Sequence, residues 1–274
     1  MAIETDVAQH YGSAGIAERI LAALRVAQGA EAPVTVDSLA PADHFHGGGV
    51  AATQELVAIL LPQAGEHLLD IGSGIGGPAR WIAAKFGVHV TGVDLTPEFC
   101  AAAEELSRAT GLSDKVTIKN GSALALPVPD NAFDRAYSQN VVMNIADKPQ
   151  FYREAFRALR PGGVLAIANA CAGPGGAPHY PQMWASSAAT SFLATPEETR
   201  RDMAEAGFTI VTFRDTTAGR LPAQTRQLER GAAVPLGIHV LMGADVVREA
   251  MQNSTRNLAE GRIVTIEALL RRPE

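Results

Sequence analysis

The sequence predicts an α/β fold in which helices cover a doubly wound, mainly parallel sheet. From residue 67 to residue 215, short apolar runs of strand length alternate with longer segments of helical periodicity. The first run turns at a cluster of glycines into a helix, and the second run ends on an acidic residue, Asp94. Both features are typical of open α/β sheets that bind a ligand at the carboxyl ends of their strands.

The stretch HLLDIGSGIGG, residues 67–77, predicts a buried strand, a sharp turn and the start of a helix near Pro78. Gly72, Gly74 and Gly76 let the backbone turn where a side chain would clash. Glycines at this place also let a ligand approach the main chain at the helix N-terminus. Alternatively, the glycines bind no ligand and serve only to let the strand and the helix pack closely.

Asp70 lies just before this turn, at the carboxyl end of the first strand. A carboxylate there would repel a phosphate but would suit an amino or ammonium group, which points to a nucleoside ligand without a pyrophosphate. Gly72, Gly74 and Gly77 also fit the dinucleotide pattern G-x-G-x-x-G. The motif alone therefore leaves NAD and FAD open.

The elements that follow continue the alternation of strand and helix. Asp94 lies roughly 20 residues past the glycines, the offset at which an acidic side chain meets ribose hydroxyls. In chain order we predict a strand in VHVTGVDL (88–95), a helix over 97–110, a strand and its exit loop in VTIKNGSALAL (116–126), a strand in NAFDRAYSQNVVMNI (131–145) ending near residues 138–140, a helix over 147–159, and a strand in LRPGGVLAIAN (159–169).

We expect a single domain over residues 1–274, divided into four parts. The first part is a helical cap over 1–50, with a helix at 13–28 and a polar, proline-containing loop at 31–44. The second is a cofactor-binding core over 51–215, which ends with a helix at 196–206 and a strand at 208–214. A helical lid over 216–260, with breaks at Pro222, Pro235 and Gly243, precedes a final strand within 261–274 that pairs with 208–214. The glycine and proline breaks make gating by the lid a reasonable hypothesis.

Composition excludes several function classes. The net charge of −6, with no run of Lys and Arg, argues against a nucleic-acid partner. No uncharged apolar stretch reaches the roughly 18 residues of a membrane span, and the N-terminus lacks the basic and apolar regions of a signal peptide. Cys100 and Cys171 form neither a disulfide framework nor a zinc motif. We expect a cytoplasmic protein without a metal, either a monomer or a homodimer.

Four ordered motifs of the chain resemble those of class I S-adenosylmethionine-dependent methyltransferases of the methyltransferase type 11 kind. They are DIGSGIGG, GVDL, NGSALALPVPDNAFD and FRALRPGGVLAI, and the resemblance covers about residues 42–215. A finer similarity, to the sarcosine/dimethylglycine methyltransferase-like group and to methyltransferases of natural-product pathways, rests on ADHFHGGGVAATQEL (42–56), SQNVVMNIADK (138–148) and HYPQMW (179–184).

The resemblance implies a Rossmann-like sheet of seven strands in the order 3-2-1-4-5-7-6, with strand 7 antiparallel. It also implies S-adenosyl-L-methionine as cofactor, in a pocket between strands 1 and 4. For the methionine part of the cofactor it assigns Asp70 and the backbone of Gly72, Ser73, Gly74 and Gly76, with Tyr11 for the carboxylate. It assigns Asp94 to the ribose, and Leu95, Ser122 and Ala123 to the adenine. Gln139 and Asn140 are assigned to the path between the cofactor and the acceptor. Many relatives carry Asp where this chain has Ser122.

The sequence offers few candidates for a catalytic base. Methyl transfer from a sulfonium is an in-line displacement, so orientation and exclusion of water supply most of the acceleration. A hydroxyl nucleophile usually needs a positioned base, most often His. In similar O-methyltransferases a His follows the fourth strand, where this chain has Asn144, which favours N- or C-methylation.

Histidines elsewhere could supply such a base. His46, which follows His44 in DHFHGGG, would lie in a loop over the active site, and His179 beside Tyr180 would form, with Trp184, a wall of the acceptor pocket. The alternatives are a histidine that holds the loop and aromatic residues that pack in the core. We name His46, Gln139, Asn144 and His179 as the catalytic candidates.

The sequence therefore predicts a methyltransferase that acts on a small molecule, first of all an amine such as sarcosine or dimethylglycine. An aromatic content of 5% opposes this, because few rings are left for a cation–π cage. An oxygen or carbon nucleophile on a secondary metabolite is the alternative acceptor. Two alternatives from other classes are a catalytically silent cofactor-binding protein and an NAD-dependent oxidoreductase.

Overall fold

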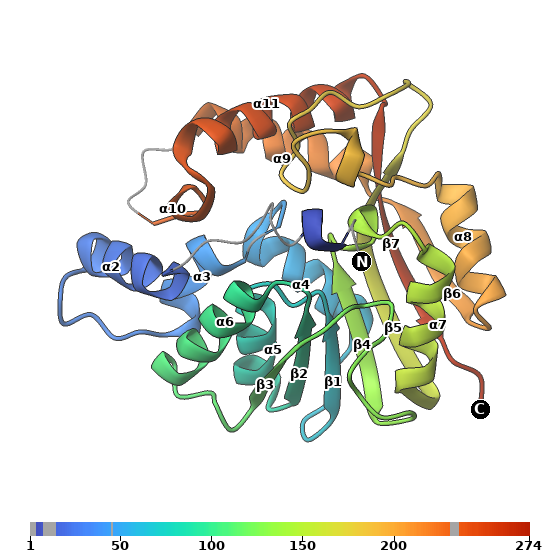
Figure 1. Ribbon diagram of the computed structural model, residues 1–274, viewed down its shortest axis with the longest axis horizontal. Coiled ribbons are helices and arrows are strands. Elements are labelled where there is room, and N and C mark those ends of the chain that lie inside the picture. The colour runs from blue at the N-terminus through green and yellow to red at the C-terminus, as the bar shows by residue number, and fades with distance from the viewer. Residues whose placement is uncertain (1–3, 8–14, 45, 231–235) are drawn as a thin grey trace.

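The computed structural model describes residues 4–7, 15–44, 46–230 and 236–274. Its centre is a seven-stranded sheet in the order β3-β2-β1-β4-β5-β7-β6 (Figure 1). The strands are β1 (His67–Ile71), β2 (His89–Asp94), β3 (Val116–Asn120), β4 (Phe133–Gln139), β5 (Leu159–Ala172), β6 (Thr209–Asp215) and β7 (Ile263–Arg271). The first five are parallel, and β7 runs antiparallel to both β5 and β6. The predicted strand order is confirmed.

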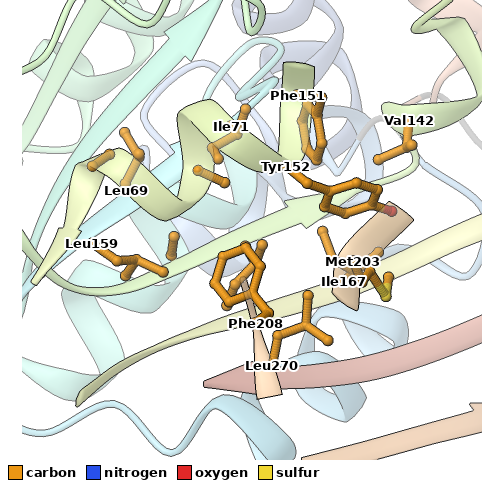
Figure 2. Packing of buried hydrophobic residues seen from close by; sticks show 14 of the residues in the cluster. Leu69, Ile71, Val142, Phe151, Tyr152, Leu159, Ile167, Met203, Phe208 and Leu270 are labelled. Atoms are coloured by element: carbon orange, nitrogen blue, oxygen red, sulfur yellow. The ribbon is translucent and has the colours of Figure 1, made fainter. Parts of the chain in front are cut away.

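Helices cover both faces of this sheet, and each face has its own apolar core. They include α4 (Gly49–Leu60), α5 (Gly77–Phe86), α6 (Pro97–Ala109), α7 (Lys148–Ala158) and α8 (Pro196–Glu205). Leu69 and Ile71 of β1 pack with Phe151 and Tyr152 of α7 on one face (Figure 2). Leu68 precedes Leu69 in the strand, so its side chain points to the other face and packs with residues of α4 and α5. The sheet is therefore buried on both sides, as its apolar strands predict.

The cap differs from its prediction because residues 31–44 are not one loop. They contain α3 (Val36–Asp43), which follows α2 (Ile16–Gln28). Thr35 and Ser38 form a capping box in which each side chain accepts a hydrogen bond from the other residue's N–H. Leu39 is fully buried in a cluster with residues of α2 and α6. This capping and burial stabilise a short helix despite the proline within it.

The segment over residues 216–260 is helical, but one predicted break is wrong. It contains α9 (Thr217–Arg230), α10 (His239–Met242) and α11 (Ala244–Ala259), which lie above the carboxyl ends of the strands (Figure 1). Pro222 lies inside α9, where the neighbouring Leu221 packs against the apolar cluster that includes Met143 and Trp184. Gly243, with a φ of 86°, does separate α10 from α11. Pro235 lies outside the described residues.

No helix in the described ranges combines the length and the apolar character needed to cross a membrane.

Candidate active site

A cavity of about 260 Å³, called here the first cavity, opens at the carboxyl ends of β1, β2 and β4. This is the point where the strand order reverses, which is where open α/β sheets bind ligands. It brings together most of the residues expected to hold the cofactor, namely Asp70, Gly72, Ser73, Gly74, Asp94, Leu95, Ser122, Ala123, Gln139 and Asn140. Their contacts with a cofactor remain a prediction.

The glycine turn is fixed by the neighbouring strand and could not carry a side chain at its start. The N–H groups of Gly72 and Ser73 both donate to the carbonyl of Val93, at 2.8 and 3.0 Å. A Cβ on Gly72 would lie 2.3 Å from Cγ2 of Val141, and the φ of Gly72 is 82°. Glycine at residue 72 therefore allows the left-handed backbone and lets Val141 pack against this turn, which forms the floor of the cavity.

Gly76 and Gly77, by contrast, serve packing. Gly76 is the N-cap of α5 with a φ of 77° and is not among the residues that line the first cavity. A Cβ on Gly77 would lie 2.1 Å from the carbonyl oxygen of Asp43. The last glycine of the apparent G-x-G-x-x-G pattern thus lets α3 approach α5.

Asp70 is a buried acid with one hydroxyl partner. The Tyr137 hydroxyl donates to Oδ2 of Asp70 at 3.0 Å. Burial, reinforced by the nearby charge of Asp94, raises the pKa of Asp70 to about 8, although the hydrogen bond from Tyr137 opposes the shift. A positive group that entered the cavity beside Asp70 would favour its ionised form.

Asp94 supports the glycine turn as well as facing the cavity. Its Oδ2 accepts a hydrogen bond from the Gly74 N–H at 2.7 Å, and its Oδ1 accepts one from the Thr96 N–H at 2.9 Å. Burial raises the pKa of Asp94 above its ordinary value, against the effect of these two N–H donors. One carboxylate therefore ties β2 to the turn that follows β1.

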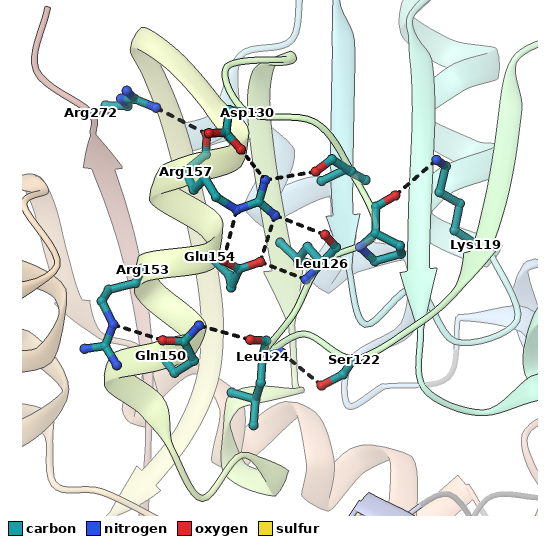
Figure 3. A network of polar contacts seen from close by, with 12 residues as sticks. Lys119, Ser122, Leu124, Leu126, Asp130, Gln150, Arg153, Glu154, Arg157 and Arg272 are labelled. Atoms are coloured by element: carbon teal, nitrogen blue, oxygen red, sulfur yellow. Dashed lines mark hydrogen bonds and ion pairs between the residues drawn. The ribbon is translucent and has the colours of Figure 1, made fainter. Parts of the chain in front are cut away.

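The loop after β3 is held against α7 by a polar network (Figure 3). Glu154 accepts from the Leu126 N–H, and Arg157 donates to the carbonyls of Leu126 and Val128. Gln150 donates to the Leu124 carbonyl at 3.0 Å. These bonds fix the backbone that presents residues 122–124 to the cavity.

Within this loop, the Ser122 hydroxyl accepts from the Leu124 N–H and donates to Glu4, which also lines the cavity. Ser122 thus contacts the N-terminal segment in this structure.

A second cavity of about 180 Å³ adjoins the first. Its walls come from β4, β5, β7, the loop at residues 183–184 and the helices of residues 216–260. Arg220 is the single permanently charged residue among those described that line it. Ten of the lining residues are apolar, and the others are polar residues and glycines; the apolar ones are Met143, Ala168, Ala170, Met183, Trp184, Ile238, Met251, Leu258, Ile263 and Ile266. Apolar side chains thus form a large part of its wall, as in many pockets for small molecules.

Three residues line both cavities and so mark the boundary between them. They are His46, Gln139 and Asn140. Burial, the neighbouring His44 ring and the Arg220 guanidinium lower the pKa of His46 to about 3, so its ring is neutral near pH 7. Asn140 follows β4 with a φ of 57°, in the left-handed region. A ligand atom in one cavity would meet a ligand atom in the other at this boundary.

The structure does not bring two of the four catalytic candidates to this boundary. His179 lines neither cavity, because its ring lies 2.9 Å from Oε2 of Glu260 and its backbone is bonded to Asn257. Asn144 lines the first cavity, but its amide nitrogen donates to the carbonyls of Trp184 and Thr190. The expectation for His179 is therefore wrong, and Asn144 holds a loop. Tyr11 lies outside the described residues.

Sequence reasoning missed two features of the site. Thr53 is fully buried beside the boundary, between His46 and Gln139. Arg220 reaches from α9 to Glu55 of α4, with 2.8 Å between Nη2 and Oε2. No local pattern marks either residue, because both act through partners that are far away in sequence. Among the described residues no group of three His, Cys, Asp or Glu side chains could hold a metal ion.

Comparison with known proteins identifies the core of the chain. Residues 69–167 match the family described as "Methyltransferase domain". The chain is 39% identical to phosphoethanolamine N-methyltransferase 1 of Arabidopsis thaliana over 127 residues, which are 46% of this chain and 26% of the relative. The chain therefore spans about a quarter of the length of that relative.

Solved structures share the fold. Geranyl diphosphate C-methyltransferase from Streptomyces coelicolor A3(2), solved with Mg²⁺, geranyl-S-thiolodiphosphate and S-adenosyl-L-homocysteine, aligns with a TM-score of 0.73 and 20% identity over 99% of this chain and 98% of that chain. The [4+2]-cyclase SpnF aligns with a TM-score of 0.66 and 25% identity over 81% and 80%. Residues 69–167 thus match a methyltransferase domain, and the chain shares the Rossmann-like fold of the solved methyltransferase structures.

Proposed function

We propose that this protein transfers a methyl group from S-adenosylmethionine to a small molecule with a largely apolar body. The observation that carries the proposal is the pair of adjoining cavities, one lined by the glycine turn and two acids, the other mainly apolar. S-adenosylmethionine supplies the methyl group as a sulfonium, an electrophile that needs no metal. The protein's own part is to align the acceptor with that methyl and to exclude water.

The first cavity suits the cofactor because its polar groups match the cofactor's parts. Asp70 can accept hydrogen bonds from an ammonium group, and Asp94 can accept them from ribose hydroxyls. The backbone of the glycine turn lines this cavity at Gly72, Ser73 and Gly74 and can meet the ligand there. The buried Ser73 hydroxyl has no partner within the described residues and offers a further contact. We expect Leu95 and Ala123 to lie against the adenine.

The second cavity favours an oxygen or carbon nucleophile over a zwitterionic amine such as sarcosine or dimethylglycine. No carboxylate lines it among the described residues, and its one permanently charged side chain there, Arg220, is a cation already paired with Glu55, so nothing in the lining offers a counter-charge to an ammonium group. Trp184 is the single Phe, Tyr or Trp ring among the described lining residues, which is too little for a cage around an ammonium. With its low pKa, His46 binds a proton only weakly and is therefore a poor general base.

The test is methyl transfer from isotopically labelled S-adenosylmethionine to a panel of acceptors, read by mass spectrometry. The panel holds glycine, sarcosine, dimethylglycine, catechols, phenols and a prenyl quinol. We expect label on a phenol, catechol or quinol. Label on sarcosine or dimethylglycine would refute the choice of acceptor. If S-adenosylhomocysteine binds but no acceptor is labelled, the protein is a silent cofactor-binding protein or, like the cyclase that shares its fold, a catalyst of another reaction.

Cofactor binding should release a proton from Asp70. With a pKa of about 8, Asp70 is mainly protonated at pH 7 in the free protein, and a bound ammonium group would drive it to the ionised form. Affinity for S-adenosylhomocysteine should therefore rise as the pH rises from 6 to 8. Calorimetry at pH 7 in two buffers of different ionisation enthalpy should show release of about one proton.

Tyr137→Phe provides the comparison for this experiment. The variant removes a hydrogen bond that lowers the pKa of Asp70, so the pKa of Asp70 should be higher than in the wild type. Its affinity for S-adenosylhomocysteine should therefore be weaker at pH 7, and the increase of affinity with pH should begin at a higher pH. Binding without proton release in either protein would show that the ammonium group does not lie beside Asp70.

We propose that residues 216–260 form a lid over the acceptor alone. Residues of this segment, among them Met251 of α11, line the second cavity, whereas none of those described lines the first. In Met251→Trp the larger ring should fill the second cavity and lower kcat/KM for the acceptor about tenfold or more. The Kd for S-adenosylhomocysteine should change less than about twofold, as measured by calorimetry.

The control for the lid experiment is Val246→Trp, which places the same ring at an exposed position of the same helix. It should leave both constants near their wild-type values. Equal loss of acceptor turnover and cofactor affinity in Met251→Trp would refute the assignment of this segment to the acceptor.

A further inference from the structure

Thr53 joins the two side chains that the site places at the boundary between the cavities. Its Oγ1 lies 3.1 Å from Nε2 of His46 and 3.2 Å from Oε1 of Gln139. His46 comes from the glycine-rich loop before α4, and Gln139 comes from the end of β4. Thr53 thus connects the segment of His46 to Gln139, which is 86 residues further along the chain than Thr53 itself.

Thr53 itself does not face either cavity. It is 0% exposed and is not among the residues that line them. Its hydroxyl therefore cannot contact a ligand directly, and it acts through its two partners. A buried hydroxyl without partners would be unfavourable, so the two hydrogen bonds also hold the three side chains together.

The single hydroxyl proton couples the states of these partners. If Thr53 donates to Oε1 of Gln139, His46 must carry its proton on Nε2 in order to donate to Thr53, and its Nδ1, 3.4 Å from the Gly47 carbonyl, then makes no hydrogen bond there. If Thr53 donates to His46 instead, Nδ1 carries the proton and donates to the Gly47 carbonyl, and Gln139 must turn its amide nitrogen toward Thr53. The hydroxyl thus links the tautomer of His46 to the direction of the Gln139 amide, and with them the hydrogen-bonding atoms offered at the boundary.

We propose that Thr53 is a positioning residue for methyl transfer, whose hydroxyl holds His46 and Gln139 where the acceptor's nucleophile meets the methyl group. This inference rests on the proposed function for its catalytic consequence. In the reaction the acceptor oxygen or carbon forms a bond to the methyl carbon, the carbon–sulfur bond breaks, and S-adenosylhomocysteine leaves with the electron pair. The acceptor's proton passes to solvent, because His46 stays neutral.

The test compares Thr53→Val, which keeps the shape and loses the hydroxyl, with Thr53→Ser, which keeps the hydroxyl. Thr53→Val should lower kcat about tenfold to 100-fold, because the reacting groups lose their fixed orientation. Its Kd for S-adenosylhomocysteine should stay within about twofold. Thr53→Ser should recover most of kcat.

The matched control is Thr91→Val. Thr91 is also a buried threonine bonded to a histidine ring, with 2.9 Å between its Oγ1 and Nε2 of His67, but it lines neither cavity. This variant should keep the wild-type kcat. A loss in Thr53→Ser as large as in Thr53→Val, or an unchanged kcat in Thr53→Val, would overturn the proposal.

A second readout does not depend on turnover. In protein labelled with ¹⁵N-histidine, the ring nitrogens of His46, assigned with His46→Gln, should show one neutral tautomer in the wild type and in Thr53→Ser. In Thr53→Val the Nε2–H tautomer loses its acceptor, so the Nδ1–H tautomer, which can donate to the Gly47 carbonyl, should also be populated. Mixed tautomers in the wild type would overturn the proposal. If no acceptor is methylated, the proposed function fails, and these spectra still decide whether Thr53 holds His46.

Discussion

Asp43→Ala is expected to lower the free energy of unfolding by about 3–5 kcal/mol, because it leaves a buried guanidinium without its counter-charge. Arg80 is fully buried in α5, and its Nη2 lies 3.0 Å from Oδ2 of Asp43. His44 Nδ1 lies 2.9 Å from the other carboxylate oxygen. Burial raises the pKa of Asp43, but the hydrogen bond with His44 and the charge of Arg80 outweigh it and hold the pKa low.

Asp37→Ala is the control for this experiment. Asp37 lies on the same helix and also pairs with a cation, Lys85, at 3.0 Å, but both side chains are exposed. Its removal should cost less than about 1 kcal/mol. Chemical denaturation of both variants measures the difference. If both variants lose the same small amount of unfolding free energy, Arg80 must bind water or another partner when Asp43 is removed.

Asp94→Ala is expected to weaken the binding of S-adenosylhomocysteine by about tenfold or more, because ribose hydroxyls lose their acceptor. The structure adds a second cause. The carboxylate also accepts the N–H groups of Gly74 and Thr96, so the variant would loosen the glycine turn that forms the floor of the cavity. Calorimetric titration measures the change in Kd.

Asp114→Ala removes the same side chain from an exposed position near β3 and should leave the Kd unchanged. An Asp94→Ala variant that binds as tightly as the wild type would show that the ribose lies elsewhere in the first cavity.

The central part of the fold could be predicted because its signals are local. The apolar run before Asp70, the glycine turn and the helix beginning near Pro78 are neighbours in sequence, and the structure has β1, the turn and α5 at these places. Parallel strands place their carboxyl ends at one edge of the sheet. Acids that end β1 and β2 therefore meet in one cavity.

The helix α3 was missed because its evidence is partly non-local. Pro41 and the polar residues of 31–44 favour a loop, and the capping pair of Thr35 and Ser38 is a weak signal by itself. The burial of Leu39 against other helices stabilises residues 36–43 as a helix. The helix in turn places Asp43 over Arg80, an ion pair across 37 residues that no sequence pattern marks.

The histidines show the same limit at the site. His46 and His179 are equally plausible in sequence, since each lies beside an apolar or aromatic stretch. The structure places His46 at the boundary of both cavities and pairs His179 with Glu260, 81 residues further along the chain. Only the three-dimensional structure shows which of the two histidines lies at the site.

The sequence by itself determined the order of strands and helices, the glycine turn and the acids at the strand ends, because these follow from short-range periodicity and backbone geometry. The tertiary structure alone decided which polar side chains meet. Thr53 between His46 and Gln139, Asp43 against Arg80, and Arg220 against Glu55 are contacts between segments far apart in the chain. Their partners are chosen by how the helices pack on the sheet, and that packing depends on the volumes and shapes of buried side chains from the whole chain.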